Sequence, residues 1–151
     1  ITVIIMDNGW TAMTGMQVNA NTATEFQTNG CRHIDLVEVV KGMGVEHLMV
    51  VDPFDLQATT AALDECLKIK GLNVGVTRRE CAIQSNRRKI KYHTVKVNAD
   101  KCINCNVCIN LTGCPALAPG EAHVSIDAKT CNGCSLCAQV CPKQAIEKEE
   151  C

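Results

Sequence analysis

Eight of the 12 cysteines in this 151-residue chain form two runs of the same design. In each run three cysteines stand three residues apart, and a Cys-Pro pair follows them. The runs are Cys102, Cys105, Cys108 and Cys114, and Cys131, Cys134, Cys137 and Cys141. Thiols at this spacing in a tight turn aim at one point, which suits a shared metal centre better than paired disulfides. The sequence therefore predicts bound metal in the last third of the chain.

Two kinds of metal centre use cysteines in this way. Structural zinc sites pair two Cys-x-x-Cys turns across a gap. Three closely spaced cysteines with a more distant Cys-Pro are typical of iron–sulfur ferredoxins, in which the fourth cysteine of a run ligates the other cluster. We therefore predict iron–sulfur clusters, with zinc as the alternative.

Residues 95–148 resemble the bacterial two-cluster ferredoxins, and this resemblance implies crossed ligation. One 4Fe-4S cluster is then expected on Cys102, Cys105, Cys108 and Cys141. The other is expected on Cys131, Cys134, Cys137 and Cys114. The first run has five residues before Cys114, where three are usual in the family. We expect this insertion, within residues 109–113, to distort the loop without removing a ligand.

A second candidate site follows the first apolar stretch, in the polar segment DNGWTAMTGMQ at residues 7–17. Asp and Asn side-chain oxygens and free main-chain carbonyls suit a hard cation such as Mg²⁺. Threonine hydroxyls and amides next to glycine suit a diphosphate. Without further information, an ordinary turn between a strand and a helix explains the segment equally well.

The elements that must position these residues alternate between strands and helices. The β-branched residues 1–6 are typical of a parallel strand buried on both faces, and residues 48–51 and 73–77 give two more short strands. Apolar residues at helical spacing predict helices over 34–43, ending at Gly44, and over 55–69, with Asp55 as N-cap and Gly71 after the end. This pattern predicts a parallel α/β sheet, whose ligands bind at the carboxyl ends of the strands. Short strands and loops without a long helix are expected from residue 95 onwards.

Cysteine content changes near residues 92–100, which predicts two domains, residues 1–92 and 93–151. Residues 78–96 carry seven basic residues and one acid, typical either of a solvated connector or of a docking strip for an acidic partner or a nucleotide. Three cysteines precede the boundary, and we expect them to be buried thiols: Cys31, Cys66 and Cys81. The terminal Cys151 has no predicted role.

Composition excludes some classes of function. The 15 Lys and Arg balance 16 Asp and Glu, which argues against binding of nucleic acid or a membrane surface through bulk charge. No apolar run is long enough to span a bilayer and no secretory leader is evident, so we expect a cytoplasmic protein. Aromatic residues make up only 3% of the chain, and bound clusters would supply the cohesion that they cannot.

The whole chain resembles the C-terminal part of the large subunit of indolepyruvate ferredoxin oxidoreductases, within the thiamine-diphosphate 2-oxoacid:ferredoxin oxidoreductases. The segments that carry the resemblance are DNGWTAMTGMQ, HIDLVEVVKGMGVEHLMVVDPFDL, VTRRECAI and LTGCPAL. The family's own first cysteine run has the same longer gap. By this resemblance Asn8 and the main-chain oxygen of Trp10 hold Mg²⁺, and Thr11, Ala12 and Met13 lie against the diphosphate of the cofactor.

The resemblance implies a fold and an activity. The fold is the C-terminal half of a parallel-sheet, thiamine-diphosphate-binding α/β domain, followed by a small ferredoxin-like α+β domain with two 4Fe-4S clusters. The activity is oxidative decarboxylation of arylpyruvates to acyl-CoA, with a second (beta) subunit, coenzyme A and ferredoxin as partners. The family's Gly-Asp motif, a further source of Mg²⁺ ligands, does not occur in this sequence, so we expect half of the cofactor site. The alternative is a non-catalytic electron-transfer ferredoxin fused to a docking α/β domain.

Overall fold

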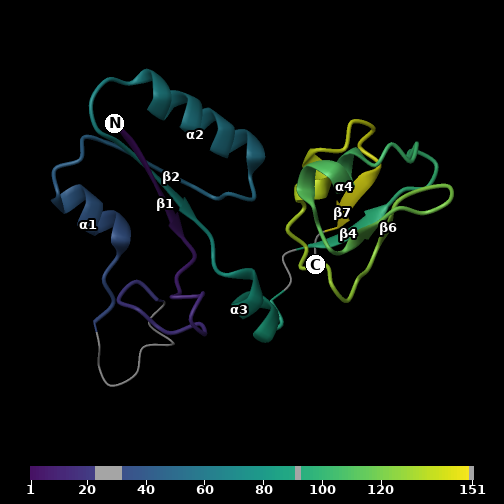
Figure 1. Ribbon diagram of the computed structural model, residues 1–151, viewed down its shortest axis with the longest axis horizontal. Coiled ribbons are helices and arrows are strands. Elements are labelled where there is room, and N and C mark those ends of the chain that lie inside the picture. The colour runs from purple at the N-terminus through teal and green to yellow at the C-terminus, as the bar shows by residue number, and fades with distance from the viewer. Residues whose placement is uncertain (23–31, 91–92, 150–151) are drawn as a thin grey trace. The chain divides into compact units, whose positions relative to one another are not determined.

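The chain folds as two compact units, Ile1–Gln84 and Ser85–Cys151 (Figure 1). The computed structural model describes residues 1–22, 32–90 and 93–149, so Cys31 and Cys151 lie outside the described residues. The division falls nearer the N-terminus than the boundary that cysteine content predicts, and the boundary after residue 92 stays a prediction.

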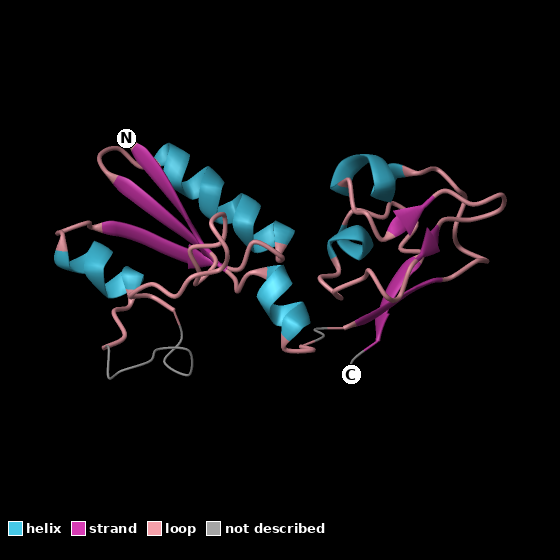
Figure 2. Cartoon of the chain, turned by 60° about the horizontal axis from the view of Figure 1, so that its bottom comes forward, coloured by secondary structure: helices cyan, strands magenta, loops and turns pink. Residues whose placement is uncertain are grey.

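The first unit is built on a parallel three-stranded sheet with strand order β1-β3-β2 (Figure 2). The strands are β1 (Thr2–Asp7), β2 (His47–Val51) and β3 (Asn73–Arg78). In register, Asp7 stands opposite Arg78, and Val51 stands opposite Thr77. The carboxyl ends of all three strands therefore meet at one edge, as the alternating pattern predicts.

Helix α1 (Leu36–Gly42) covers one face of this sheet. Asp35 caps its N-terminus by accepting a 2.7 Å hydrogen bond from the Val37 amide. The buried side chains of Val37 and Val40 pack against those of Val74 and Val76 in β3. Gly44 follows the helix with a φ of 80°, so the predicted stop is confirmed.

Helix α2 (Leu56–Lys68) covers the opposite face. The predicted N-cap is confirmed, because Asp55 accepts a 2.9 Å hydrogen bond from the Ala58 amide. Cys66 is 2% exposed and confirms the prediction of a buried thiol. It packs over Gly75, where an added Cβ would lie 3.9 Å from the Cys66 sulfur and 3.1 Å from Ile4 Cδ1. Glycine at this position lets the helix approach the sheet closely.

One prediction about β1 is wrong. The run was expected to be buried on both faces, but Val3, Ile4 and Met6 are 41%, 40% and 86% exposed. Among the described residues β1 pairs with β3 alone, and the two helices pack over β2 and β3. A β-branched sequence favours a strand but does not decide whether that strand is central.

The second unit begins within helix α3 (Ala82–Arg87) and is a small α+β structure. Strand β4 (Thr94–Val97) pairs antiparallel with β7 (Ile146–Glu149), and β5 (Leu117–Ala118) pairs antiparallel with β6 (Ser125–Ile126). Its core contains four aliphatic side chains and two thiols: Val95, Leu117, Val124, Ile146, Cys108 and Cys137. Cysteines therefore take places that large apolar side chains fill in other small domains.

The two short helices of this unit differ in length. Helix α4 (Val107–Thr112) has six residues and α5 (Leu136–Gln139) has four. The longer gap before Cys114 was expected to distort a loop, and this prediction is wrong, because the extra residues extend α4. Gly113 ends the helix in the left-handed conformation, with a φ of 56°.

Candidate metal centres and cofactor loop

Two residues in the first part of each cysteine run have a left-handed backbone conformation. Asn104 and Asn106 have φ values of 50° and 55°, and Gly133 and Ser135 have φ values of 76° and 60°. The second pair follows the first after the same 29-residue offset that separates Cys102 from Cys131. The repeat in sequence is thus a repeat in backbone conformation.

Four thiols from both runs line one hollow in the second unit. Cys141 of the second run joins the first three cysteines of the first run: Cys102, Cys105, Cys108 and Cys141. The hollow is partly open to solvent, and the rest of its lining is Ile103, Asn106, Val124, Pro142, Lys143, Ala145 and Ile146. The Ala145 amide donates a 3.3 Å hydrogen bond to the Cys141 sulfur. Four thiols in a mainly apolar hollow fit the chemistry of an iron–sulfur cluster.

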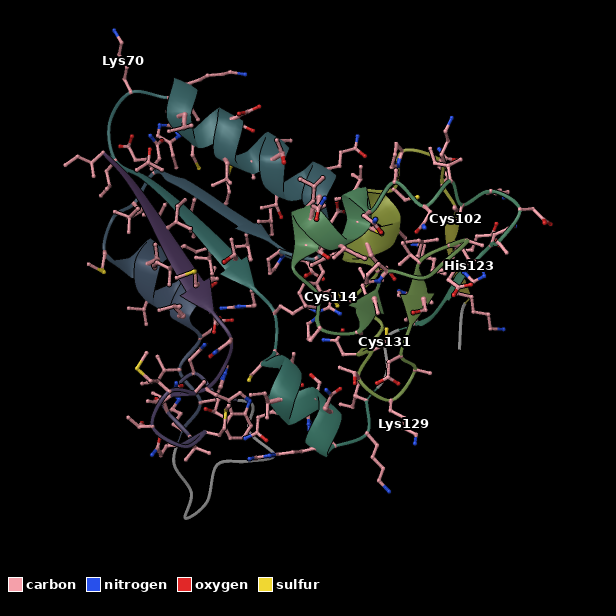
Figure 3. The ribbon with its side chains drawn as sticks, turned by 45° about the vertical axis from the view of Figure 1, so that its right-hand side comes forward. Lys70, Cys102, Cys114, His123, Lys129 and Cys131 are labelled. Atoms are coloured by element: carbon pink, nitrogen blue, oxygen red, sulfur yellow. The ribbon has the colours of Figure 1, made fainter. Side chains whose placement is uncertain are left out.

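The other four thiols form a second group. Burial, with a smaller contribution from the nearby thiols of Cys134, Cys131 and Cys114, raises the pKa of the Cys137 thiol to about 12. The pKa of Cys134 is raised for the same reasons, with Cys114 again among its neighbours. Cys114 of the first run thus lies with the cysteines of the second, and Figure 3 shows it in the same part of the unit as Cys131.

The environment of these thiols disfavours thiolates in the absence of a cation. Burial also raises the pKa of Cys108, with Cys141 and Cys105 close by. A bound metal replaces the thiol protons and offsets the desolvation of sulfur, which couples metal binding to folding. Among the described residues, no three His, Cys, Asp or Glu side chains are arranged around a single ion. A four-iron cluster offers each thiolate its own iron, so its ligands lie farther apart than those of one ion.

The loop after β1 starts at the carboxyl edge of the sheet. The Asn8 side-chain oxygen accepts a 3.0 Å hydrogen bond from the Trp10 amide, so one turn joins these two predicted Mg²⁺ ligands. The Asn8 carbonyl accepts a 3.1 Å hydrogen bond from the Cys81 amide beyond β3. Because an amide oxygen has two lone pairs, Asn8 can accept from Trp10 and still bind a cation. The donor chemistry of this turn fits a partial Mg²⁺ site.

Cys81 is less buried than the sequence predicts. Its side chain is only partly covered, because it follows the end of β3 at the edge of the sheet instead of lying under a helix as Cys66 does. Its sulfur lies 3.7 Å from the sulfur of Met16, so it packs against the far end of the loop.

The predicted diphosphate-side residues lie farther along the same loop. Thr11 pairs with Gln17 in a two-way backbone bridge, with hydrogen bonds of 3.0 and 3.1 Å. Met13, at the tip between them, is 99% exposed, and Ala12 is partly exposed. The structure therefore holds Thr11, Ala12 and Met13 together on a closed loop.

The Asp7 carboxylate is engaged by the protein itself. Its Oδ1 accepts from the Gly9 amide at 3.0 Å and from the Asn21 side chain at 2.7 Å. Its Oδ2 accepts from Arg78 Nε at 2.8 Å. Asp7 is 8% exposed, so these bonds satisfy a nearly buried charge. Its role is to anchor the root of the loop.

Arg78 links this anchor to α1. Its guanidinium donates to both oxygens of Asp35, at 2.8 and 3.4 Å. The Arg78 hydrogen bond and the Val37 amide hold the pKa of Asp35 at about 2. At the end of β2, Asp52 forms an ion pair with Arg79, whose guanidinium lies 4.4 Å from the centroid of the Phe54 ring. Two adjacent arginines thus connect the loop, α1 and β2 at one edge.

Sequence reasoning missed two residues that shape the loop. Thr22 is fully buried, and its hydroxyl donates a 2.6 Å hydrogen bond to the Gly9 carbonyl. Asn21 donates to Asp7, and its side-chain oxygen accepts from the Leu36 amide at 3.2 Å. Polar residues close to a ligand loop were the available signal, but their partners are set by the fold.

The two units match two different families of known proteins. Residues 1–74 match the family model "Thiamine pyrophosphate enzyme, C-terminal TPP binding domain", and residues 124–147 match "4Fe-4S binding domain". The indolepyruvate oxidoreductase subunit IorA of Thermococcus kodakarensis is 39% identical over 153 residues, which is 97% of this chain and 24% of that subunit. The chain is an IorA-like segment, made of a C-terminal thiamine-pyrophosphate-binding domain and a 4Fe-4S-binding domain. The predicted family is confirmed.

Two further relatives match nearly all or about half of this chain. The IorA subunit of Pyrococcus abyssi is 40% identical over 98% of this chain and 24% of its own length. The segment thus spans about a quarter of the IorA subunits that it matches. The pyruvate synthase subunit PorD of Methanothermobacter marburgensis is 34% identical over 51% of this chain and 94% of its own length.

The IorA-like segment also has the predicted fold class. A parallel three-stranded α/β sheet of the thiamine-pyrophosphate-binding type precedes a small α+β region of the 4Fe-4S-binding type. The 4Fe-4S match, residues 124–147, contains the second cysteine run. In the part of the chain that the structure describes, no helix has the length and apolar character needed to cross a membrane.

Proposed function

We propose that this segment supplies the electron-transfer clusters and one half of the cofactor site of a 2-oxoacid:ferredoxin oxidoreductase. The substrates are arylpyruvates of the indolepyruvate type, and the products are acyl-CoA, CO₂ and reduced ferredoxin. The names of the IorA relatives support the substrate class. The observation that carries the proposal is the placing of Cys141 with Cys102, Cys105 and Cys108, because it joins two separate motifs into one four-thiol site.

The ligand sets of the two proposed 4Fe-4S clusters follow the two thiol groups. Cluster 1 uses Cys102, Cys105, Cys108 and Cys141. Cluster 2 uses Cys131, Cys134, Cys137 and Cys114. When bound, thiamine diphosphate supplies an electron sink for decarboxylation, and the clusters accept the electrons one at a time.

In the cofactor half-site, Asn8 and the Trp10 main-chain oxygen bind Mg²⁺, and Thr11, Ala12 and Met13 face the diphosphate. The hydrogen bond between Asn8 and Trp10 supports this assignment, because it keeps the two donors in one turn. Asp7, Arg78 and Thr22 fix the position of that turn and leave Asn8 for the cation. The remaining Mg²⁺ ligands come from a part of the complex that this sequence does not contain.

The complete complex includes a second (beta) subunit, and we place it in the cytoplasm with ferredoxin as electron acceptor. The test uses this complex with coenzyme A under anaerobic conditions. Indolepyruvate or phenylpyruvate should bleach the cluster absorbance, and a low-potential acceptor should restore it. Bleaching by dithionite but by no 2-oxoacid would contradict the proposal and favour the non-catalytic electron carrier.

A further inference from the structure

The seven basic residues within residues 78–96 fall into two sets in the structure. Arg78 and Arg79, at the end of β3, are used inside the first unit, where they form ion pairs with three aspartates. The later members begin in α3 and belong to the second unit. No Asp or Glu occurs between Glu80 and Asp100, so this part of the chain has a positive charge of its own.

The first members of the later set form an exposed surface that we call the basic strip, made of Arg87, Lys89 and Ile90. Arg87 and Lys89 are exposed, and within the described part of the chain neither takes part in an ion pair. Ile90 beside them is 36% exposed. The amides of Lys89 and Ile90 donate to the carbonyls of Asn86 and Ser85, at 3.0 and 2.9 Å, and fix the backbone of the strip. Unpaired charge next to an apolar side chain suits contact with a protein partner.

The basic strip is tethered close to the second thiol group. Only two residues separate Ile90 from His93, so the Cα atoms of these two residues lie within about 11 Å of each other. The main chain of His93 packs directly against Gly133, where an added Cβ would collide with the His93 carbonyl oxygen and lie 2.7 Å from its nitrogen. Gly133 stands between Cys131 and Cys134. The segment that follows the strip is therefore anchored on the turn of the second cysteine run.

The first thiol group offers less unpaired charge to a partner. Among the described residues that line its hollow, Lys143 is the only charged one. Lys101, just before the first run, is paired with Glu147 at 2.7 Å. Before the second run, the charges of Asp127 and Lys129 offset each other. The basic strip thus presents more unpaired positive charge than the surroundings of the hollow.

Resting on the two-cluster function proposed above, we propose that the basic strip is the docking surface for the acidic face of a one-electron carrier protein, and that electrons leave through cluster 2. In each encounter one electron leaves reduced cluster 2 and enters the oxidised carrier, and no bond forms or breaks. Opposite charges speed such encounters, and transient redox complexes have small interfaces, so a short strip is enough. Because the rate of electron transfer falls steeply with distance, a carrier at the strip receives its electron from the cluster beside it.

The experiment uses the complete complex, reduced with dithionite and freed of excess reductant, and follows electron transfer to an acidic ferredoxin by stopped-flow absorbance. The second-order rate constant of the wild type should fall as salt is added, because ions screen the attraction. Arg87→Gln/Lys89→Gln should lower this rate constant about tenfold at low salt and flatten its salt dependence. Reduction of methyl viologen, a small dication that needs no basic surface, should be unchanged.

The matched control is Lys68→Gln/Lys70→Gln, which removes two exposed positive charges from the first unit. This variant should keep the rate constant and the salt dependence of the wild type. An equal loss in the control would overturn the proposal, because net charge would then be the cause. If the strip variant keeps electron transfer and instead binds coenzyme A more weakly, the strip is a nucleotide site, and the proposal is also overturned.

Carbodiimide cross-linking tests the choice of cluster, because it joins a carboxylate of the ferredoxin to a lysine amine where the two are in contact. Peptide mapping of the linked complex should find Lys89 at low salt. Absence of a link at Lys89, or a link at Lys143 in its place, would overturn the proposal, since Lys143 lines the hollow of the first thiol group.

Failure of the proposed function would give different results. If indolepyruvate does not bleach the clusters but dithionite reduces them, the catalytic function fails and docking is still measured from the dithionite-reduced complex. If indolepyruvate bleaches wild type and strip variant alike and both reduce ferredoxin at the same rate, only the docking proposal is overturned. If iron analysis finds no second cluster in the wild type, both proposals fail.

Discussion

Arg78 and Asp7 stand opposite each other on neighbouring parallel strands, and Arg78 Nε lies 2.8 Å from Asp7 Oδ2. The Asp7 side chain is 5% exposed, whereas that of Arg78 is 36% exposed. The ion pair therefore closes the carboxyl end of the sheet directly below the proposed Mg²⁺ turn. The same guanidinium holds Asp35 at the start of α1, so one side chain joins the strand, the loop and the helix.

Replacing Arg78 by Met should destabilise the first unit by about 1–3 kcal/mol, because the nearly buried Asp7 charge loses its partner. Urea unfolding followed by the fluorescence of Trp10, the chain's single tryptophan, measures this change. The control is Lys41→Met, which breaks an ion pair whose side chains are 56% and 67% exposed. That change should stay within about 0.5 kcal/mol. Equal effects of the two variants would contradict the anchoring role of Arg78.

Acid stability should depend on Asp35. Its pKa is lowered from 3.8 to about 2, mainly by the hydrogen bond from Arg78. A carboxylate with a lowered pKa in the folded state stabilises the fold above pH 3.8 and loses this contribution as the pH falls through 2. Asp35→Asn should therefore be less stable at neutral pH and show a flatter loss of stability over this acid range. Trp10 fluorescence during urea unfolding at each pH checks this.

A carboxylate in the other unit provides the control for that titration. Lys101 and Asn98 lower the pKa of Glu147, which belongs to β7. Glu147→Gln should leave the acid dependence of the Trp10 signal unchanged. A flattened acid limb in this variant as well would mean that Trp10 reports global charge and not the Asp35 pair.

Iron content tests the thiol groups directly. The wild-type chain should carry about eight irons and eight sulfides, and Cys105→Ser or Cys141→Ser should each reduce the iron to about four. The double variant Cys105→Ser/Cys141→Ser should lose no more than either single variant, because both thiols line one hollow. Cys105→Ser/Cys137→Ser should lose nearly all iron, because it damages both groups.

The control for the iron analysis is Cys81→Ser, which lies outside both thiol groups and should keep the full complement. Stoichiometric zinc with little iron in anaerobic wild-type protein would contradict the cluster assignment. Additive loss of iron in Cys105→Ser/Cys141→Ser would contradict the crossed arrangement alone.

The Mg²⁺ assignment predicts a selective loss of catalysis. In the complete complex, Asn8→Ala should slow bleaching by indolepyruvate roughly 100-fold, because it removes a cation ligand. Reduction by dithionite should stay intact, since no cysteine changes. Asn86→Ala, at an exposed asparagine of helix α3, should behave like the wild type in both assays. Loss of dithionite reduction in Asn8→Ala would indicate misfolding, and unimpaired bleaching would contradict the role of Asn8.

Local signals in the sequence predicted much of this fold. The caps and stops, such as Asp55 and Gly44, act on residues a few positions away, and the structure has them where the sequence places them. The exposed β1 could not be predicted, because edge position depends on the order of all three strands. Composition distinguishes a strand from a helix better than it distinguishes an edge strand from a central one.

The candidate sites also combine features that the sequence predicts with features that it does not predict. The spacing of the cysteines is enough to indicate a metal module, since their chemistry and their turns are local. The link from Asp7 to Arg78 joins residues 71 positions apart, and no pattern within either segment announces it.

The exchange of thiols between the two cysteine runs also constrains their inheritance. Each run contributes its first three thiols to one group and its fourth thiol to the other group. Deleting either run would leave one group with three thiols and the other with one, so neither would be complete. The matching left-handed turns are what a duplicated segment would leave behind, but the two copies no longer work separately. Evolution or protein engineering can therefore retain, delete or transfer the two cysteine runs only together.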